Sequence, residues 1–278
     1  ALSSAASDVY KRQFDKELPE NNIVTIQPDS LRILHNPLTG WVLYASMGVD
    51  AADFWAQYDH MYIPELGHNV SVTDYAHTLY IRASWTDFNP QEDVYGWKID
   101  SNLRAYIEGA YQRNMRLAFR VVVDSRDKRT EFTPQFVKDA GAKGFMNKGK
   151  WSPYSDDSVF QKYYTKFVKA LAKDFNDPSK VEFIDGFGLG KWGEYHTMIY
   201  STGDDTPKKA VFDWVTDIYS QAFDKVPVVI NYHRWIGAGK DWVDDEHFAA
   251  DSEEMLEEAI KKGYSLRHDA FGMTTYYG

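Results

Sequence analysis

The sequence contains no cysteine, which excludes a disulfide framework and thiolate chemistry. It also has no run of about eighteen apolar residues, the length that a transmembrane helix needs, so we expect no insertion into a membrane. Positive charge is in the minority: 31 Lys and Arg stand against 41 Asp and Glu, for a net charge of −10. This balance argues against nucleic acid and anionic membrane surfaces as partners.

What the chain does have is length and aromatic side chains. Its 278 residues, 44% of them hydrophobic, suffice for one large core, so a single α/β barrel or two smaller domains would fit. Aromatic residues make up 16%, with nineteen Tyr and nine Trp. They can serve as large packing residues or as flat platforms for sugars, and composition alone does not decide between the two.

The first thirteen residues, ALSSAASDVYKRQ, differ in character from the rest. They resemble translated sequencing-adapter read-through, as found at the ends of metagenomic reading frames. A native polar tail or a processed terminus is the alternative. Under either interpretation we expect residues 1–13 to be a poorly ordered tail, and residues 14–278 to carry the fold.

Strand-like and helix-like segments alternate along the remaining chain. Short apolar runs are separated by amphipathic segments near residues 51–58, 100–114 and 157–175. Two later helices are also predicted, one that begins at Thr206 and one that ends before Gly263. This alternation predicts a parallel sheet. The predicted strands cover residues 41–45, 78–84, 116–123, 181–187, 226–232 and 264–269.

Polar residues lie at the carboxyl ends of five successive predicted strands, from Arg82 on the second to Asp269 on the sixth. In a (β/α)8 barrel the active site lies at that rim, whereas a doubly wound sheet gathers its polar residues at one switch point. We therefore predict an α/β fold of the TIM barrel type. Only about six βα units are present, so the barrel is expected to be incomplete and truncated before strands seven and eight.

The most informative stretch covers residues 181–196, VEFIDGFGLGKWGEYH. A buried strand leads into four glycines, which let other groups approach the backbone closely. The stretch ends on Glu194, set among Trp192, Tyr195 and His196. A partly desolvated carboxylate beside aromatic rings is a candidate general acid, although an ordinary solvated or salt-bridged glutamate is the alternative.

The same stretch matches G-x-G-x-x-G through Gly188, Gly190 and Gly193. That fingerprint binds a dinucleotide only where a helix begins directly at the glycines. Here the next helix start is at Thr206, thirteen residues past Gly193, so we interpret the match as chance.

Several motifs together resemble a known group of enzymes. They are Arg82-x-x-Trp85, Asn89-Pro90-x-Glu92 and Tyr95-Gly96-Trp97-x-Ile99-Asp100, with Trp192-Gly193-Glu194-Tyr195-His196 further on. The first three are similar to the second-strand region of clan A glycoside hydrolases, in particular family 42 β-galactosidase-like enzymes. The last is similar to bacterial barrel domains of unknown function, and the resemblance covers roughly residues 30–278.

The resemblance implies a retaining glycosidase that acts on a β-linked oligo- or polysaccharide. Glu194 matches its acid/base after strand four, and its nucleophile glutamate follows strand seven, before which this chain is expected to stop. Clan A enzymes usually carry Asn directly before the acid/base, where this sequence has Gly193. The resemblance implies no metal and no cofactor, and it alone favours a periplasmic or extracellular location in a bacterium. The expected sugar contacts are Arg82, Trp85, Arg120, Trp192, Tyr195, His196, Asn231, Arg267 and Asp269.

Two other functions stay open. A barrel without a nucleophile would still bind carbohydrate, which gives a non-catalytic binding protein. A metal-dependent hydrolase could use His35, His196, His233 and His268, but the first strand lacks the His-x-His pair that such a site would need. For Arg82, Arg120 and Arg267, structural ion pairs with Asp124 or Asp269 are as compatible with the sequence as sugar contacts.

Overall fold

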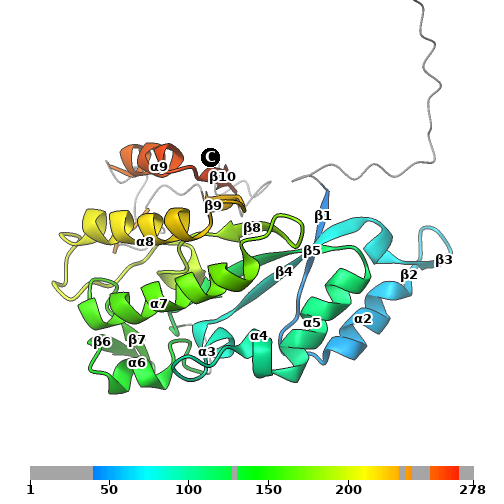
Figure 1. The fold of residues 1–278 in the computed structure, drawn as a ribbon, viewed down its shortest axis with the longest axis horizontal. Helices are drawn as coiled ribbons and strands as arrows, with labels where there is room; N and C mark the ends of the chain where they lie inside the picture. The colour runs from blue at the N-terminus through cyan, green and yellow to red at the C-terminus, as the bar shows by residue number, and fades with distance from the viewer. Residues whose placement is uncertain (1–39, 127–129, 232–235, 240–250, 269–278) are drawn as a thin grey trace, which may run out of the picture. The chain divides into compact units, whose positions relative to one another are not determined.

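The computed structural model describes residues 40–126, 130–231, 236–239 and 251–268. At its centre is a six-stranded sheet whose strand order follows the chain order, and every neighbouring pair is parallel (Figure 1). The predicted tail of residues 1–13 lies outside the described residues. The six strands are β1 (Trp41–Tyr44), β4 (Ala76–Ser84), β5 (Arg116–Val122), β8 (Val181–Asp185), β9 (Val228–Asn231) and β10 (Ser265–Arg267).

This strand order identifies the fold class. A doubly wound sheet reverses its direction of growth at a switch point, whereas here each strand is added beside its predecessor in the sheet, as in a barrel. Within the described residues β1 and β10 are the two edges, so the six strands form an open half-barrel. The predicted fold, its six strands and their parallel pairing are confirmed.

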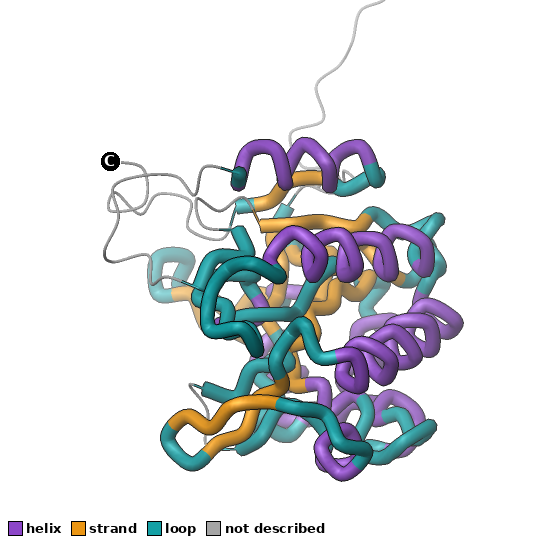
Figure 2. Tube along the Cα trace, turned by 90° about the vertical axis from the view of Figure 1, so that its left-hand side faces the viewer, coloured by secondary structure: helices purple, strands orange, loops and turns teal. Residues whose placement is uncertain are grey.

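Five longer helices connect the strands, and Figure 2 shows them gathered on one side of the sheet. Three begin at an aspartate (Asp50, Asp100 and Asp157) whose side chain accepts a hydrogen bond from a backbone N–H of the first turn. No helix in the described ranges is both long and apolar enough to cross a membrane. The helices are α2 (Ala51–Asp59), α5 (Ser101–Gln112), α7 (Ser158–Phe175), α8 (Lys208–Ala222) and α9 (Ser252–Lys261).

The hydrophobic core lies between the sheet and these helices. Alternate residues of the central strands, such as Ile81 and Phe119, point toward the helices and are fully buried. Phe160 and Phe167 of the amphipathic helix α7 are buried in the same core. Burial of each such side chain contributes roughly 1.5–3 kcal/mol to folding.

Two connections contain more structure than the sequence indicated. The connection 125–156, between β5 and α7, includes α6 (Gln135–Asp139) and a hairpin of β6 (Gly144–Asn147) and β7 (Lys150–Pro153). Its turn residues Lys148 and Gly149 both have positive φ, as a tight two-residue hairpin requires. The connection 47–75 holds a second hairpin, β2 (Met61–Ile63) with β3 (His68–Val70). The short helices are η2 (Val72–Asp74), α3 (Trp85–Phe88), α4 (Gly96–Ile99) and η3 (Lys191–Gly193).

Candidate active site on the concave face of the sheet

A cavity of about 410 Å³ opens on the face of the sheet that carries no helices. Side chains from five strands and from the loop after β8 line it. They are Val42, Tyr44, Tyr80, Arg82, Arg120, Phe183, Glu194 and Arg267.

Strand register explains why these side chains meet. Arg82 of β4 is paired with Arg120 of β5, so both guanidiniums leave the sheet on the same face. The residues on either side of Arg120, Phe119 and Val121, point the other way into the core. The period-2 alternation therefore places charge on the concave face and apolar groups on the helix face.

Asp185, at the end of β8, is the central hydrogen-bond acceptor of this face and has no exposed surface. Its Oδ2 accepts hydrogen bonds from Arg120 Nε at 2.9 Å and from Arg267 Nη1 at 2.6 Å. The Tyr80 hydroxyl donates to the same oxygen. Burial, and then the charge of Asp185, raises the pKa of Tyr80 well above its usual value, so this hydroxyl stays protonated and remains a donor.

Glu194 lies at the carboxyl rim of the sheet with its side chain 15% exposed to the cavity. Its Oε1 accepts from Arg120 Nη1 at 3.0 Å, and its Oε2 is 3.5 Å from His196 Nε2. The carboxylate of Glu194 is thus contacted by a guanidinium and an imidazole, whereas the sequence predicted a surrounding of aromatic rings. Arg120 bridges Glu194 to the buried Asp185 and fixes its position.

The loop that carries Glu194 holds several residues in left-handed backbone conformations. Trp192, Tyr195 and Thr197 have φ of 59°, 60° and 51°, values that cost energy in residues other than glycine. Gly188, with φ of +74°, packs so closely that a Cβ would come within 2.5 Å of Tyr164 Oη and Val121 O. Such strain concentrates at functional sites. The loop contains no α-helix after its glycines, which agrees with interpreting the G-x-G-x-x-G match as chance.

The other predicted sugar contacts differ in how close they lie to the cavity. Arg82 donates from Nη2 to the Trp192 carbonyl at 2.9 Å and so supports the Glu194 loop from below. The half-buried Trp192 ring stands edge-on to His196, with 5.5 Å between ring centroids. His196 is buried and bonds Thr197 Oγ1 at 2.7 Å. Arg82, Arg120, Arg267 and Glu194 are therefore brought together in the cavity, with His196 directly beneath Glu194.

Trp85 and Tyr195 are corrections to the predicted sugar contacts. Trp85 follows the end of β4, where Ser84 caps the helix α3, and this turn carries its ring into the core beside Tyr164 and Phe167. It is 0% exposed and presents no surface to a ligand. Tyr195 is likewise buried under its own loop against Phe187 and Phe212, and burial raises the pKa of its hydroxyl well above the usual value.

Other predicted positions lie at the margin of the site. Asn231 is on the concave face of β9, paired in register with Arg267, and its Oδ1 is buried without a hydrogen bond. Asp124 forms an ion pair with Arg126 at 2.6 Å and does not line the cavity, which makes it a structural group. Asp269 falls outside the described residues, as do His35 and His233.

The sequence analysis missed Tyr80, Phe183 and Asp185. It considered polar residues only where strands end, and the aspartate was hidden in a run that looked uniformly buried. The sequence did contain one indication. Phe183 and Asp185 are two residues apart in their strand, as are Tyr80 and Arg82 in theirs, and residues two apart in a strand point to the same face of the sheet. Applying this two-residue period along each strand would have placed these four side chains on the concave face.

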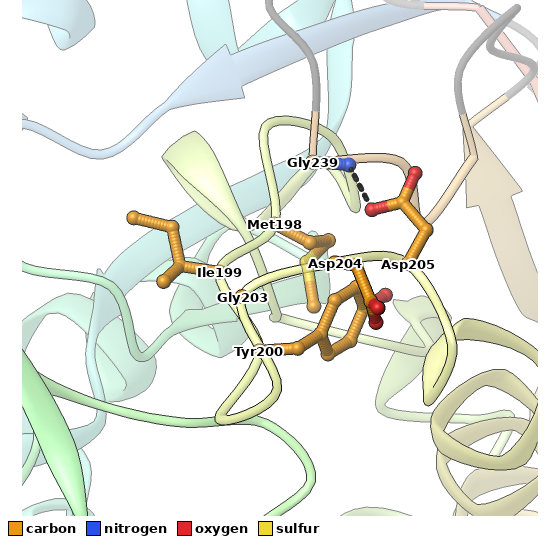
Figure 3. A pocket seen from close by; sticks show the side chains of 7 residues that line it. All are labelled: Met198, Ile199, Tyr200, Gly203, Asp204, Asp205 and Gly239. Atoms are coloured by element: carbon orange, nitrogen blue, oxygen red, sulfur yellow. Dashed lines mark hydrogen bonds between the residues drawn. The ribbon is translucent and has the colours of Figure 1, made fainter.

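A second cavity, of about 480 Å³, lies beside the loop that follows β8 (Figure 3). Its two carboxylates are engaged with backbone groups: Asp205 accepts from Gly239 N at 2.9 Å, and Asp204 accepts from Thr206 N at 3.0 Å. Tyr200, whose pKa burial raises, donates to the Gly237 carbonyl. These bonds fix the loop and leave no group poised for chemistry.

Comparison with known proteins finds likeness among solved structures. Xylanase B from Clostridium stercorarium F9 is similar at 13% identity and a TM-score of 0.44, over 82% of this chain and 59% of that one. GH10 from Paenibacillus barcinonensis has 12% identity and a TM-score of 0.46, over 82% and 58%. Endo-glycoceramidase II from Rhodococcus sp. has 13% identity and a TM-score of 0.44, over 80% and 60%. No protein-family model and no curated protein matches the sequence.

The chain spans between 58% and 60% of the length of these three proteins. At such identities and TM-scores the likeness assigns neither an activity nor a catalytic residue to this chain. The resemblance to family 42 enzymes stays a prediction.

Proposed function

We propose that the cavity binds a β-linked glycoside and that Glu194 acts as the general acid/base in its hydrolysis. The observation that carries this proposal is the position of Glu194: a carboxylate at the carboxyl rim of a parallel half-barrel, open to the cavity, on a strained loop, and held by Arg120. Parallel barrels carry their active sites at this rim.

The geometry suggests how Glu194 would work. Arg120 holds Oε1, so Oε2, which lies 3.5 Å from His196 Nε2, is the oxygen that would carry the transferred proton. That proton would pass to the glycosidic oxygen as the bond from the anomeric carbon to this oxygen breaks. Tyr44 and Phe183 offer ring surface in the same cavity for a sugar face.

Glycosidases use a second carboxylate, about 5–5.5 Å from the first for retention and about 6.5–9.5 Å for inversion. Among the described residues, Glu194 is the one carboxylate that lines the cavity, because Asp185 is fully buried and Asp124 is paired with Arg126. This observation favours a second candidate function, a carbohydrate-binding protein without turnover. Under the first proposal it predicts little spontaneous hydrolysis by this chain.

An external nucleophile separates the two functions. Azide can form the bond to the anomeric carbon of a 4-nitrophenyl β-glycoside while the phenolic oxygen leaves with the proton of Glu194, which yields a glycosyl azide and 4-nitrophenol. A hydrolase site should release nitrophenol in proportion to azide. With the matching phenyl β-glycoside, whose leaving group needs the proton, Glu194→Gln should suppress the release of phenol. A binding protein should bind the methyl β-glycoside by calorimetry but release nothing. Failure to bind any β-glycoside would contradict both functions.

A further inference from the structure

The two ring nitrogens of His196 face different partners. On one side Nε2 lies 3.5 Å from Glu194 Oε2, at the outer limit of a hydrogen bond. On the other side Nδ1 is 2.7 Å from the hydroxyl oxygen Oγ1 of Thr197. The imidazole is buried, and the Trp192 ring stands edge-on to it. Its protein neighbours, and not bulk water, therefore decide which nitrogen carries the proton.

The kind of group at Nδ1 matters for this choice. A carbonyl or a carboxylate can only accept, so it would hold the ring proton on Nδ1 and leave Nε2 as an acceptor. A hydroxyl can also donate, so Thr197 can give its O–H to Nδ1 while Nε2 keeps the ring proton. The carboxylate of Glu194 on the other side favours the second arrangement, because an ionised carboxylate is an acceptor only.

The backbone of Thr197 is in a costly conformation. Its φ of 51° lies in the left-handed region, where a β-branched residue is an outlier. The Thr197 carbonyl accepts a hydrogen bond from Arg126 Nη2, and Arg126 Nε donates to Asp124 Oδ2 at 2.7 Å. A strained residue persists only where its surroundings hold it, and such residues concentrate at functional sites. The pair of Asp124 and Arg126 thus holds Thr197 beside His196.

From these contacts we infer that Thr197 is a positioning residue: it fixes His196 as the tautomer whose proton is on Nε2, directed at Glu194 Oε2. The inference rests on the proposed function of Glu194. An unprotonated Nε2 would accept the proton of Oε2 and draw it away from the glycosidic oxygen, whereas an Nε2–H leaves that proton for the substrate. Once the proton has passed to the departing oxygen, the same N–H donates to the carboxylate that remains, and the imidazole keeps its own proton. Catalytic hydrogen bonds are often long before a substrate is bound.

The tautomer can be measured directly by NMR. Long-range proton–nitrogen correlation spectra of the 278-residue chain, labelled with nitrogen-15 histidine, separate protonated from unprotonated ring nitrogens. Spectra recorded at about pH 8, where an unperturbed imidazole is neutral, are compared with those of His196→Gln, whose missing signals identify His196. The proton should be on Nε2. A proton on Nδ1, alone or together with one on Nε2, would overturn the inference.

Two variants test the role of the hydroxyl. Thr197→Val keeps the branched shape and removes the hydroxyl, so the fraction of His196 protonated on Nε2 should fall. Azide-assisted cleavage of a phenyl β-glycoside should slow by roughly tenfold or more, which corresponds to a lost hydrogen bond to a charged group. Cleavage of the 2,4-dinitrophenyl β-glycoside and binding of the methyl β-glycoside should change little. Thr197→Ser retains the hydroxyl and should match the wild type in all of these measurements.

The matched control is Thr216→Val, which removes another buried threonine hydroxyl. That hydroxyl donates to the Phe212 carbonyl within α8 at 2.7 Å, away from the cavity. This variant should lose stability but keep the His196 tautomer and the ratio of the phenyl to the dinitrophenyl rate. A change in that ratio as large as in Thr197→Val would assign the effect to stability and overturn the inference.

The outcomes separate the inference from the proposed function. A wild-type chain without azide-assisted cleavage would contradict the proposed function, while the tautomer in the wild type and in Thr197→Val would still test the contact of Thr197 with His196. An unchanged tautomer and an unchanged phenyl rate in Thr197→Val would overturn the inference and leave Glu194 as the acid. Should Thr197→Val not fold, by circular dichroism, the tautomer of the wild type still decides the matter.

Discussion

The two faces of the central sheet are built from the same strands and differ almost completely. Toward the helices, Ile81, Phe119 and Val121 are fully buried in an apolar core. On the concave face, one residue away in each strand, Arg82 and Arg120 join a charged network. The difference teaches that one face of the half-barrel stabilises the fold, while the other holds charges in place at a cost in desolvation that only their mutual pairing offsets.

The largest expected effect is on the helix face. Phe119→Ala should destabilise the protein by about 4 kcal/mol, because Phe119 is fully buried and its ring packs against Phe88 and Phe175. Phe183→Ala, on the half-buried concave face, is the matched control and should cost less than about 2 kcal/mol. Urea unfolding measures both, and equal losses would mean that the two faces contribute alike.

The second-largest loss of stability is expected at Asp185, the central hydrogen-bond acceptor of the concave face. Asp185→Ala should cost about 3 kcal/mol, because it leaves Arg120 and Arg267 without the carboxylate that both of them bond. Asp185→Asn keeps the shape and should cost less. Binding of methyl β-glycosides should weaken in both variants, since Arg120 also positions Glu194. An Asp185→Ala protein as stable as the wild type would show that this network has no structural role.

A smaller effect is expected where the two faces meet, at the loop that carries Glu194. Gly188→Ala should cost about 2 kcal/mol, because φ is +74° and the new Cβ would meet the Val121 carbonyl and the Tyr164 hydroxyl. Gly203→Ala is the control, since its φ of +79° is similar but nothing lies within 4 Å of its Cβ position. Equal thermal shifts in the two variants would assign the cost to φ alone and not to close packing.

The smallest effect concerns an ion pair away from both faces, between Asp59 at the end of α2 and Arg113, the residue that follows α5. Arg113 Nε donates to Asp59 Oδ1 at 2.7 Å, and this hydrogen bond lowers the pKa of Asp59. A lowered folded pKa stabilises the protein above the unfolded pKa, and this contribution is lost as pH falls through the folded value. Asp59→Asn should cost less than about 1 kcal/mol near neutral pH, since the pair is partly exposed, and the cost should shrink as pH falls toward about pH 2. A cost that is constant between these pH values would contradict the assignment.

Most of the fold was predictable, because the hydrophobic periodicity of a helix or strand can be recognised within a short segment of the sequence. All six strands were located within about three residues at each end, and the helix at Thr206 began two residues before α8. The hairpin at Lys148 and Gly149 was missed, because Lys in a left-handed turn position has no strong sequence signal.

The site was predictable only in part. Strand-end position was enough to find Arg82, Arg120, Glu194 and Arg267, but the roles of Trp85 and Asp185 depend on which way a side chain leaves the strand or the turn after it. For Trp85 the capping of α3 by Ser84 turns the ring into the core. For Asp185 the decisive partners come from β4, β5 and β10, which are distant in sequence.

The most direct test of the central claim, that Glu194 is the proton donor of the cavity, is the leaving-group dependence of azide-assisted cleavage in Glu194→Gln. If Glu194 protonates the departing oxygen, the variant should keep its fold and glycoside binding. It should lose roughly a hundredfold in rate or more with phenyl β-glycosides, and little with 2,4-dinitrophenyl β-glycosides, which leave without protonation. Equal losses with both substrates would contradict the claim.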